Sequence, residues 1–381
     1  MILIKNAKVY APQYLGVKDI LVSGSVIEAV EDSIELDLPC CQVIDAKGKL
    51  LTPGIIDPHV HITGGGGEGS FHTQVPSVKL TELIEGGVTT AVGLLGTDGI
   101  TRSVENLLAK AKALREEGIT VYALTGAYGY PSVTLTGDIK KDITFVDEII
   151  GVKLALSDHR APNVTADELI RLASDARVAG MISGKCGMIT LHMGDAPQGL
   201  APVREALAKT AIPIKIFHPT HVTRRRELLE EAFDFANQGG YIDMTSNSKD
   251  SEPTAAFVVE AKERGVALDK ITMSSDGMGS WSTYDEAGNL LKIGYSAVNT
   301  NLVELRRLVQ NYGMDLSEAL TFVTSNTAHA LEIFPKKGCV QAGADADLLL
   351  MEEDLSLDSV IAMGKFMMKG HKVVHKAAYE D

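Results

Sequence analysis

The sequence has few cysteines and basic residues, and it contains no long apolar run. Its four cysteines, at positions 40, 41, 186 and 339, form no CxxC pair, so neither a disulfide framework nor a zinc-finger cage is expected. No apolar stretch approaches the roughly 18–20 residues that span a bilayer. The N-terminus also lacks the long apolar region and cleavage site of a secretory signal. These absences predict a cytoplasmic protein without a membrane segment.

The charge balance argues against one large class of partner. Of 381 residues, 50 are acidic and 36 are basic, which gives a formal net charge of −14. Nucleic acid is not an expected partner, because a protein that binds phosphates needs a basic face. Hydrophobic residues make up 45% and charged residues 23%, as in a folded globular protein. The length suits about two or three domains, or one large α/β barrel with an accessory part.

Both ends of the chain alternate apolar and polar residues in short runs that glycines interrupt. A period of two with turn residues between the runs predicts short antiparallel strands. Neither end is long enough to hold a core of its own, so we expect residues 1–50 and 343–381 to form one small β-sandwich domain together. The runs are Met1–Lys5, Val17–Val22, Val26–Val30, Ala346–Met351, Leu357–Met363 and Lys365–Val374.

Residues 51–342 follow a different pattern, in which short apolar runs alternate with longer helical segments. Eight strands that alternate with helices predict an α/β fold, a parallel (β/α)₈ barrel of the TIM type. A doubly wound open sheet would need a phosphate-binding loop that opens the first helix, and no GxxxxGK[ST] sequence is present. The predicted strands are Gly54–Asp57, Thr90–Leu95, Thr120–Thr125, Ile150–Leu156, Met188–Met193, Ile212–Phe217, Tyr241–Thr245 and Lys270–Ser274. The predicted helices include Val104–Glu117, Ala166–Val178, Val203–Lys209, Arg226–Gln238 and Ala255–Glu263.

The active site of such a barrel forms at the carboxyl ends of its strands, so polar residues at those positions are the candidate site. Two of them, His59 and His61, are two residues apart along a strand, so both imidazoles point the same way. Neutral imidazole is a good ligand for zinc and related divalent ions. An HxH pair alone is weak evidence, but further histidines and an aspartate at later strands favour a metal site. The candidates are His59, His61, Lys153, His192, His221 and Asp276. His218 lies three residues before His221, and only one of these two histidines need be a ligand.

Lys153 is unusual because it lies inside the apolar run Ile149–Leu156. A buried ammonium is costly unless it is paired or neutralised. Lys153 therefore either pairs with a nearby acid or is carboxylated by CO₂, in which case its two carbamate oxygens can bridge two cations. The surrounding ligand types favour the carbamate. Asp276 can bind metal and accept the proton of an attacking water, or it can simply cap the helix that follows.

These residues together resemble those of the binuclear amidohydrolase superfamily. The HxH pair follows the run Pro53–Pro58, and Gly343–Leu350 is similar to the superfamily's return into its small β domain. Within the superfamily, several motifs resemble those of the isoaspartyl (β-aspartyl) dipeptidases, and the resemblance extends over essentially the whole chain. These motifs are Gly64–Glu68, Gly93–Asp98, Leu124–Tyr128, Ser157–Arg160, Pro219–Val222 and Ser274–Gly277.

The resemblance implies two divalent metal ions per chain, with zinc as the expected metal. Their ligands would be His59, His61, Lys153, His192, His221 and Asp276, with a carbamate on Lys153 as the bridge. Asp276 would also be the catalytic proton shuttle, and Tyr128 would donate to the developing oxyanion. A carboxylate suits a substrate ammonium and arginines suit a terminal carboxylate. The implied substrate contacts are Gly66, Gly67, Glu68, Thr97, Tyr128, Arg160, Arg224 and Ser280.

The implied activity is hydrolysis of the β-linked amide of isoaspartyl dipeptides, with a bridging hydroxide as the nucleophile. The resemblance also implies a homo-oligomer, with an octamer as the candidate. One alternative is an amidohydrolase for a cyclic amide, such as a dihydropyrimidine or hydantoin, although such a ring lacks a free ammonium for Glu68. The other is an inactive barrel that serves as a scaffold, although such a protein would be expected to lose metal ligands. His72 has no assigned role, and Tyr130 competes with Tyr128 for the oxyanion.

Overall fold

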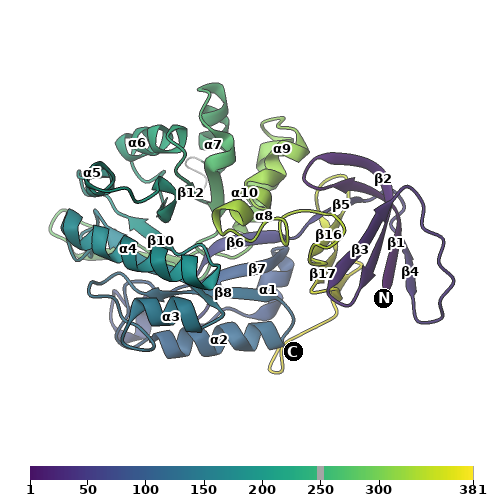
Figure 1. The fold of residues 1–381 in the computed structure, drawn as a ribbon, viewed down its shortest axis with the longest axis horizontal. Helices are drawn as coiled ribbons and strands as arrows, with labels where there is room; N and C mark the ends of the chain where they lie inside the picture. The colour runs from purple at the N-terminus through teal and green to yellow at the C-terminus, as the bar shows by residue number, and fades with distance from the viewer. Residues whose placement is uncertain (247–252, 381) are drawn as a thin grey trace.

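The chain folds into a barrel with a separate sheet at one end (Figure 1). The computed structural model describes residues 1–246 and 253–380. Eight parallel strands follow one another in chain order from β6 to β13, and helices surround them. His61 N donates to Gly277 O at 2.9 Å, and Val60 forms a bridge with Gly277, so the two edges of the sheet meet. The predicted (β/α)₈ barrel is confirmed.

The barrel elements alternate as the sequence predicts. The strands are β6 (Ile55–Val60), β7 (Val88–Gly93), β8 (Thr120–Gly126), β9 (Ile149–Leu156), β10 (Met188–Met193), β11 (Phe217–Thr220), β12 (Ile242–Thr245) and β13 (Ile271–Ser274). The helices are α1 (Leu80–Glu85), α2 (Val104–Glu116), α3 (Ile139–Phe145), α4 (Ala166–Ser183), α5 (Ala201–Lys209), α6 (Arg226–Asn237), α7 (Thr254–Glu263), α8 (Thr300–Gln310), α9 (Leu316–Thr321) and α10 (Ser325–Ala330). Short 3₁₀ turns are η1 (Phe71–Thr73), η2 (Ile214–Ile216) and η3 (Leu268–Lys270).

The predicted position of the sixth barrel strand, Ile212–Phe217, is wrong. Pro213 has no N–H for a strand ladder, and the residues after it form the 3₁₀ turn η2. The strand therefore begins only at Phe217, which pairs with Ile189 of β10, and Thr220 pairs with His192. As a consequence, His221 follows the strand directly and lies beside the end of β10.

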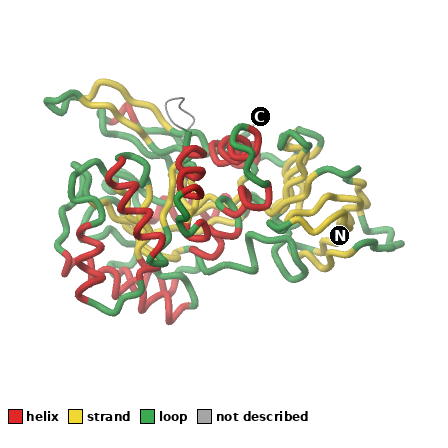
Figure 2. Tube along the Cα trace, turned by 90° about the horizontal axis from the view of Figure 1, so that it is seen from above, coloured by secondary structure: helices red, strands yellow, loops and turns green. Residues whose placement is uncertain are grey.

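The strands from the two chain ends share one nine-stranded sheet, in the order β19-β18-β17-β16-β5-β1-β2-β3, with β4 paired to β1. Figure 2 shows yellow strands grouped beside the N-terminus, at one end of the molecule. The predicted pairing of the two ends is therefore confirmed, whereas the boundaries at residues 50 and 343 stay a prediction. One glycine that separates two of the predicted runs, Gly16, does not interrupt a strand, because it lies inside β2 with φ 87°. The strands are β1 (Ile2–Tyr10), β2 (Tyr14–Ser23), β3 (Val26–Glu31), β4 (Gln42–Asp45), β5 (Leu50–Pro53), β16 (Leu348–Met351), β17 (Leu357–Ala362), β18 (Lys365–Lys369) and β19 (Lys372–Val373).

Strands β4 and β5 have no counterpart among the predicted runs, and neither has the element that follows β13. After β13 the chain forms a separate two-stranded antiparallel hairpin, β14 (Ser280–Tyr284) and β15 (Leu290–Tyr295). Its first residue, Ser280, starts immediately beyond the Asp276–Gly279 turn that ends the barrel. Across the described residues, no helix is both long and apolar enough to cross a membrane.

A buried ion-pair group joins the barrel to the terminal sheet. Lys337 is only 3% exposed, and its ammonium contacts Asp347 and lies 2.9 Å from Asp345. Asp347 also accepts a hydrogen bond from Met363 N at 2.8 Å, and its carbonyl accepts one from Gly54 N at 2.8 Å. Asp347 therefore connects the start of the first barrel strand with the turn between β17 and β18.

Lys337→Met tests how much this ion-pair group contributes to the stability of the protein. The variant leaves two carboxylates buried without their cation, so the free energy of unfolding in urea should fall by about 3–5 kcal/mol. The matched control is Lys140→Met, which breaks a half-exposed pair with Asp175 and should cost about 1 kcal/mol or less. Equal losses in the two variants would contradict the role of Lys337.

Candidate active site

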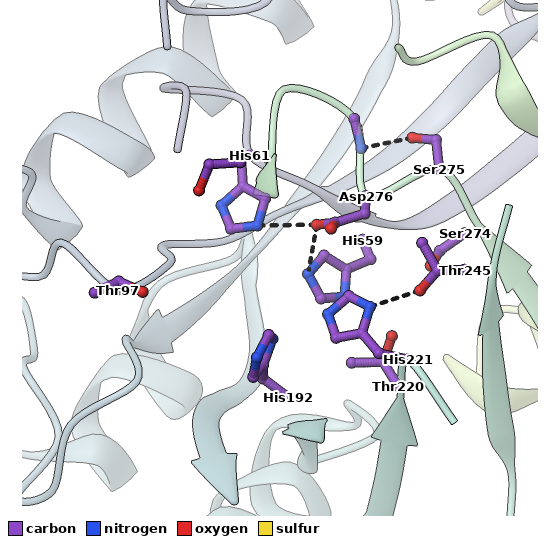
Figure 3. Close-up of polar contacts among 12 residues, drawn as sticks. His59, His61, Thr97, His192, Thr220, His221, Thr245, Ser274, Ser275 and Asp276 are labelled. Carbon is purple, nitrogen blue, oxygen red and sulfur yellow. Dashed lines mark hydrogen bonds and ion pairs between the residues drawn. The ribbon is translucent and has the colours of Figure 1, made fainter. Parts of the chain in front are cut away.

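The predicted metal ligands come together at the carboxyl ends of the barrel strands. Figure 3 shows five of them: His59, His61, His192, His221 and Asp276. His59 and Lys153 lie within β6 and β9, His192 lies near the end of β10, and His61 and His221 directly follow β6 and β11. Asp276 follows β13. All of them are buried except Asp276, whose side chain is 13% exposed.

Asp276 lies between two histidines of the cluster. Its Oδ1 is 3.1 Å from His61 Nε2 and 3.4 Å from His59 Nε2. Among the described residues, no donor makes a hydrogen bond to this buried oxygen. His59, His221 and Asp276 offer ligand atoms that all lie within 4.8 Å of one another. The carboxylate oxygen and the ring nitrogens thus converge on one point.

His221 and His192 complete the ring of imidazoles. The centroid of His221 lies 5.0 Å from that of His59 and 4.6 Å from that of His192. Thr245 Oγ1 lies 2.6 Å from His221 Nδ1 and fixes the orientation of that ring. Burial lowers the pKa of His59, His192 and His221 well below the ordinary value, so these imidazoles are neutral near pH 7. Neutral rings have a nitrogen lone pair available for a metal ion.

Lys153 is completely buried next to these imidazoles. Its Nζ lies 3.0 Å from His59 Nε2, and no described carboxylate forms an ion pair with it. Burial lowers the pKa of Lys153 to about 7, because the apolar strand disfavours the ammonium form. The acid partner of the simpler sequence interpretation is thus not among the described residues.

The donor set fits divalent metal ions. Four imidazoles, one carboxylate and one lysine amine lie next to one another, and Asp276 Oδ1 has no protein donor among the described residues. Of these, His59, His221 and Asp276 offer ligand atoms close enough to share one ion. Nitrogen and carboxylate ligands in this combination suit zinc and related ions. The residues that would hold them are His59, His61, Lys153, His192, His221 and Asp276, as the sequence predicts.

Beside this cluster lies a second set of predicted residues, which we call the recognition group: Glu68, Thr97, Arg160, Arg224 and Ser280. Ser280 Oγ lies 3.0 Å from both carboxylate oxygens of Glu68. Arg160 Nη1 is 3.2 Å from Glu68 Oε1 and 3.5 Å from Thr97 Oγ1. Arg224 Nη1 reaches His192 Nε2 at 3.4 Å. Opposite charges therefore lie side by side at the edge of the histidine cluster.

The glycine-rich loop that carries Glu68 depends on backbone conformations that favour glycine. Gly66 and Gly67 have φ values of 82° and 99°, and a Cβ on Gly66 would lie 2.6 Å from Thr73 O. Arg102 holds the same loop from behind, since its guanidinium donates to the carbonyls of Thr63, Gly65 (3.3 Å) and Val75 (2.9 Å). These contacts hold the loop in a defined conformation, so it is not a flexible linker.

Tyr128 is the phenol that reaches the histidine cluster. Its Oη lies 2.6 Å from His192 Nδ1, and burial raises its pKa, so the hydroxyl keeps its proton at neutral pH. Tyr130 is only partly buried and packs against the barrel core. His72 is exposed in η1. The geometry therefore favours Tyr128 over Tyr130 for the oxyanion role.

Three buried aspartates support the site, and the sequence analysis assigns them no role. Asp57 accepts from His59 N at 3.2 Å and from Ser275 N, which ties β6 to the segment after β13. Asp243 accepts from hydroxyl groups of β11 and β13, including Thr220 Oγ1 at 2.7 Å. Burial raises the pKa of Asp57 to about 7 and that of Asp243 to about 6. Asp158 contacts Arg160 and His192. A carboxylate within or just after a barrel strand is the sequence signal that could have identified each one.

Comparisons with known proteins assign this barrel to a class. The model of the amidohydrolase family matches residues 50–367, so the chain belongs to the amidohydrolase family. This superfamily generally uses a binuclear metal centre. A D-hydantoinase (dihydropyrimidinase) structure from Thermus sp. has a TM-score of 0.61 at 17% identity, covers 100% of this chain and 98% of its own, and shows the fold alone.

A more specific similarity extends over the entire chain. The crystal structure of beta-aspartyl dipeptidase from Fervidobacterium islandicum AW-1, in complex with beta-Asp-Leu dipeptide, is 42% identical, with a TM-score of 0.94 and 100% of both chains covered. The predicted resemblance to the isoaspartyl dipeptidases is therefore confirmed. The dihydroorotase of Listeria monocytogenes is 33% identical over 162 residues, which are 41% of this chain and 37% of that protein. The chain thus matches only about a third of that relative's length.

Metal content tests the ligand set. Protein purified without chelator should contain two equivalents of divalent metal per chain by elemental analysis. Lys153→Met has a similar volume but no amine that could carry a carbamate, so it should retain native circular dichroism and bind less than one equivalent. A Lys153→Met protein that keeps two equivalents would show that the lysine is no part of the metal site.

Proposed function

We propose that the protein is a metal-dependent dipeptidase that hydrolyses the β-linked amide of L-isoaspartyl dipeptides. The observation that carries the proposal is the position of Glu68, 3.2 Å from Arg160, at the edge of the histidine cluster. A zwitterionic dipeptide has an ammonium that suits Glu68 and a carboxylate that suits Arg160. The whole-chain similarity to the F. islandicum enzyme with its bound beta-Asp-Leu supports the same substrate class.

The recognition group gives each end of such a dipeptide a partner. Glu68 would bind the α-ammonium, and the N–H groups of Gly66 and Gly67 with Thr97 would bind the α-carboxylate. Arg160 and Arg224 would together hold the carboxylate of the leaving residue, each through its own N–H donors. Ser280 would hold Glu68 in place through its hydroxyl.

The cofactors that fit the ligand set are two divalent ions, with zinc as the candidate, and a CO₂-derived carbamate on Lys153. Ions bound there would polarise the scissile carbonyl and supply hydroxide at neutral pH. Lys153 suits carboxylation because its buried amine has no acid partner among the described residues. The homo-oligomer, its size and the cytoplasmic location stay predictions.

The remaining chemistry falls to two side chains. Asp276 accepts the proton of the attacking water and delivers it to the leaving amine nitrogen as the C–N bond breaks. Tyr128 donates its phenolic hydrogen bond to the carbonyl oxygen as negative charge develops there. The products are aspartate and the free leaving amino acid.

Asp276→Asn tests the proton transfer. The amide keeps the shape of the side chain but cannot accept the proton, so kcat for β-Asp-Leu should fall by roughly 10²–10⁴. Activity and metal content are measured together after reconstitution with zinc, and exposed Asp234→Asn on α6 is the control. Turnover close to wild type in a fully loaded Asp276→Asn protein would remove Asp276 from the mechanism.

Cyclic-amide hydrolysis is the second candidate, because part of the chain is 33% identical to a dihydroorotase. A cyclic amide such as dihydroorotate or dihydrouracil has no primary ammonium, so it would leave the carboxylate of Glu68 without a partner. An inactive scaffold is not favoured, because all six predicted ligand positions carry metal-binding side chains.

Substrate specificity tests the proposal most sharply. An α-linked dipeptide places its ammonium and carboxylate differently and leaves polar groups unpaired, so kcat/KM should favour β-Asp-Leu over α-Asp-Leu by roughly 10⁴. Glu68→Gln should lower kcat/KM for β-Asp-Leu about 100-fold with unchanged metal content, while exposed Glu205→Gln should match wild type. Equal rates on the two isomers, or preference for dihydroorotate or dihydrouracil, would overturn the isoaspartyl assignment.

A further inference from the structure

Asp158 lies between the two arginines of the recognition group and the histidine cluster, and none of the roles above uses it. It is the second residue after β9 and is only 4% exposed. Gly194 packs directly against it, since a Cβ on Gly194 would lie 2.3 Å from Asp158 Cα and 2.4 Å from its Cβ. The preceding residue, Ser157, has a left-handed backbone (φ 53°) and donates from Oγ to Gly199 O at 2.8 Å. Asp158 is therefore held in place from two sides.

Each carboxylate oxygen of Asp158 has defined partners. Oδ1 accepts from Arg160 Nε at 2.9 Å and from Arg160 N at 2.8 Å, and Oδ2 accepts from Arg160 Nη2 at 3.0 Å. Oδ2 also lies 3.1 Å from His192 Nε2 and 3.6 Å from Arg224 Nη1. The two-point contact with Arg160 leaves Nη1 of that guanidinium facing Glu68 and Thr97.

The carboxylate of Asp158 offsets the repulsion between the two arginines. Arg160 and Arg224 both approach His192 Nε2 at 3.4 Å, so two positive charges gather around one neutral ring. Without a counter-charge they would repel each other and turn toward water. A buried carboxylate between them keeps both guanidinium groups in position for a single ligand carboxylate, and its contact with His192 fixes the ring that carries a proposed ligand nitrogen.

We infer that Asp158 is a positioning residue: it aligns Arg160 and Arg224 into one site for the substrate's terminal carboxylate and fixes the ring of His192. This inference rests on the proposed function. Asp158 would thus contribute to the specificity for a free C-terminus through the two arginines, without contacting the substrate itself. The consequence is a selective loss: removing the charge of Asp158 should weaken the use of the terminal carboxylate more than the use of the rest of the dipeptide.

The test compares two substrates that differ only at that carboxylate, β-Asp-Leu and β-Asp-leucinamide. Asp158→Asn should lower kcat/KM for β-Asp-Leu at least ten times more than kcat/KM for the amide, mainly through KM. Both substrates are measured on protein reconstituted with zinc to the wild-type metal content, so that any loss of metal through His192 does not contribute to the comparison. Asp142→Asn is the matched control, because Asp142 is a fully buried carboxylate that accepts from Thr125 and Thr136. It should change both substrates by the same factor.

Gly194→Ala gives an independent test if Asp158→Asn does not fold. The new methyl group would displace Asp158 without removing its charge, so the same tenfold selective loss is expected. Equal losses on the two substrates in the folded variants would overturn the positioning role and leave the dipeptidase proposal intact. A wild-type protein that does not hydrolyse β-Asp-Leu would instead overturn the proposed function itself.

Discussion

The burial of Lys153 is the constraint on which the rest of the site depends. A lysine side chain with no solvent contact, in the middle of a barrel strand, disfavours its own charge, and its Nζ lies 3.0 Å from His59 Nε2. The neighbouring imidazoles are buried and neutral as well, so each has one ring nitrogen with a free lone pair. A bound cation, or a group that binds cations, would give these nitrogen atoms a common partner. The proposed carbamate is such a group, because it converts a costly cation into an anionic ligand.

Acidic and basic side chains alternate along a chain of contacts beside this centre. Glu68 lies against Arg160, and Arg160 lies against Asp158, which in turn contacts His192. The proposed ammonium and carboxylate sites therefore share one chain of contacts with a proposed metal ligand. A substrate that engages both ends of this chain would be held in a fixed position relative to the scissile bond, which is how a site converts binding into rate.

Much of this arrangement follows from the sequence because its periodicities are strong. Apolar runs of strand length separated by helical segments predict the barrel, and strand ends then identify His59, His192 and Asp276 as neighbours although they are far apart along the chain. The sixth strand shows the limit of that reasoning, because the apolar run before Phe217 continues through the turn that Pro213 starts. Left-handed backbones at His221 (φ 62°) and Asp276 (φ 50°) re-aim both side chains, and no pattern of residue types reveals such conformations. The role of Asp158 depends on the close approach of Gly194, which only the folded chain shows.

The most direct test of the central claim is ¹³C nuclear magnetic resonance of the zinc-loaded protein after exchange with ¹³C-bicarbonate. The account predicts one carbamate carbon per chain in the wild-type protein and none in Lys153→Arg, whose guanidinium does not form a carbamate. A wild-type protein with two bound metal ions and no carbamate resonance, or the same resonance in Lys153→Arg, would contradict it.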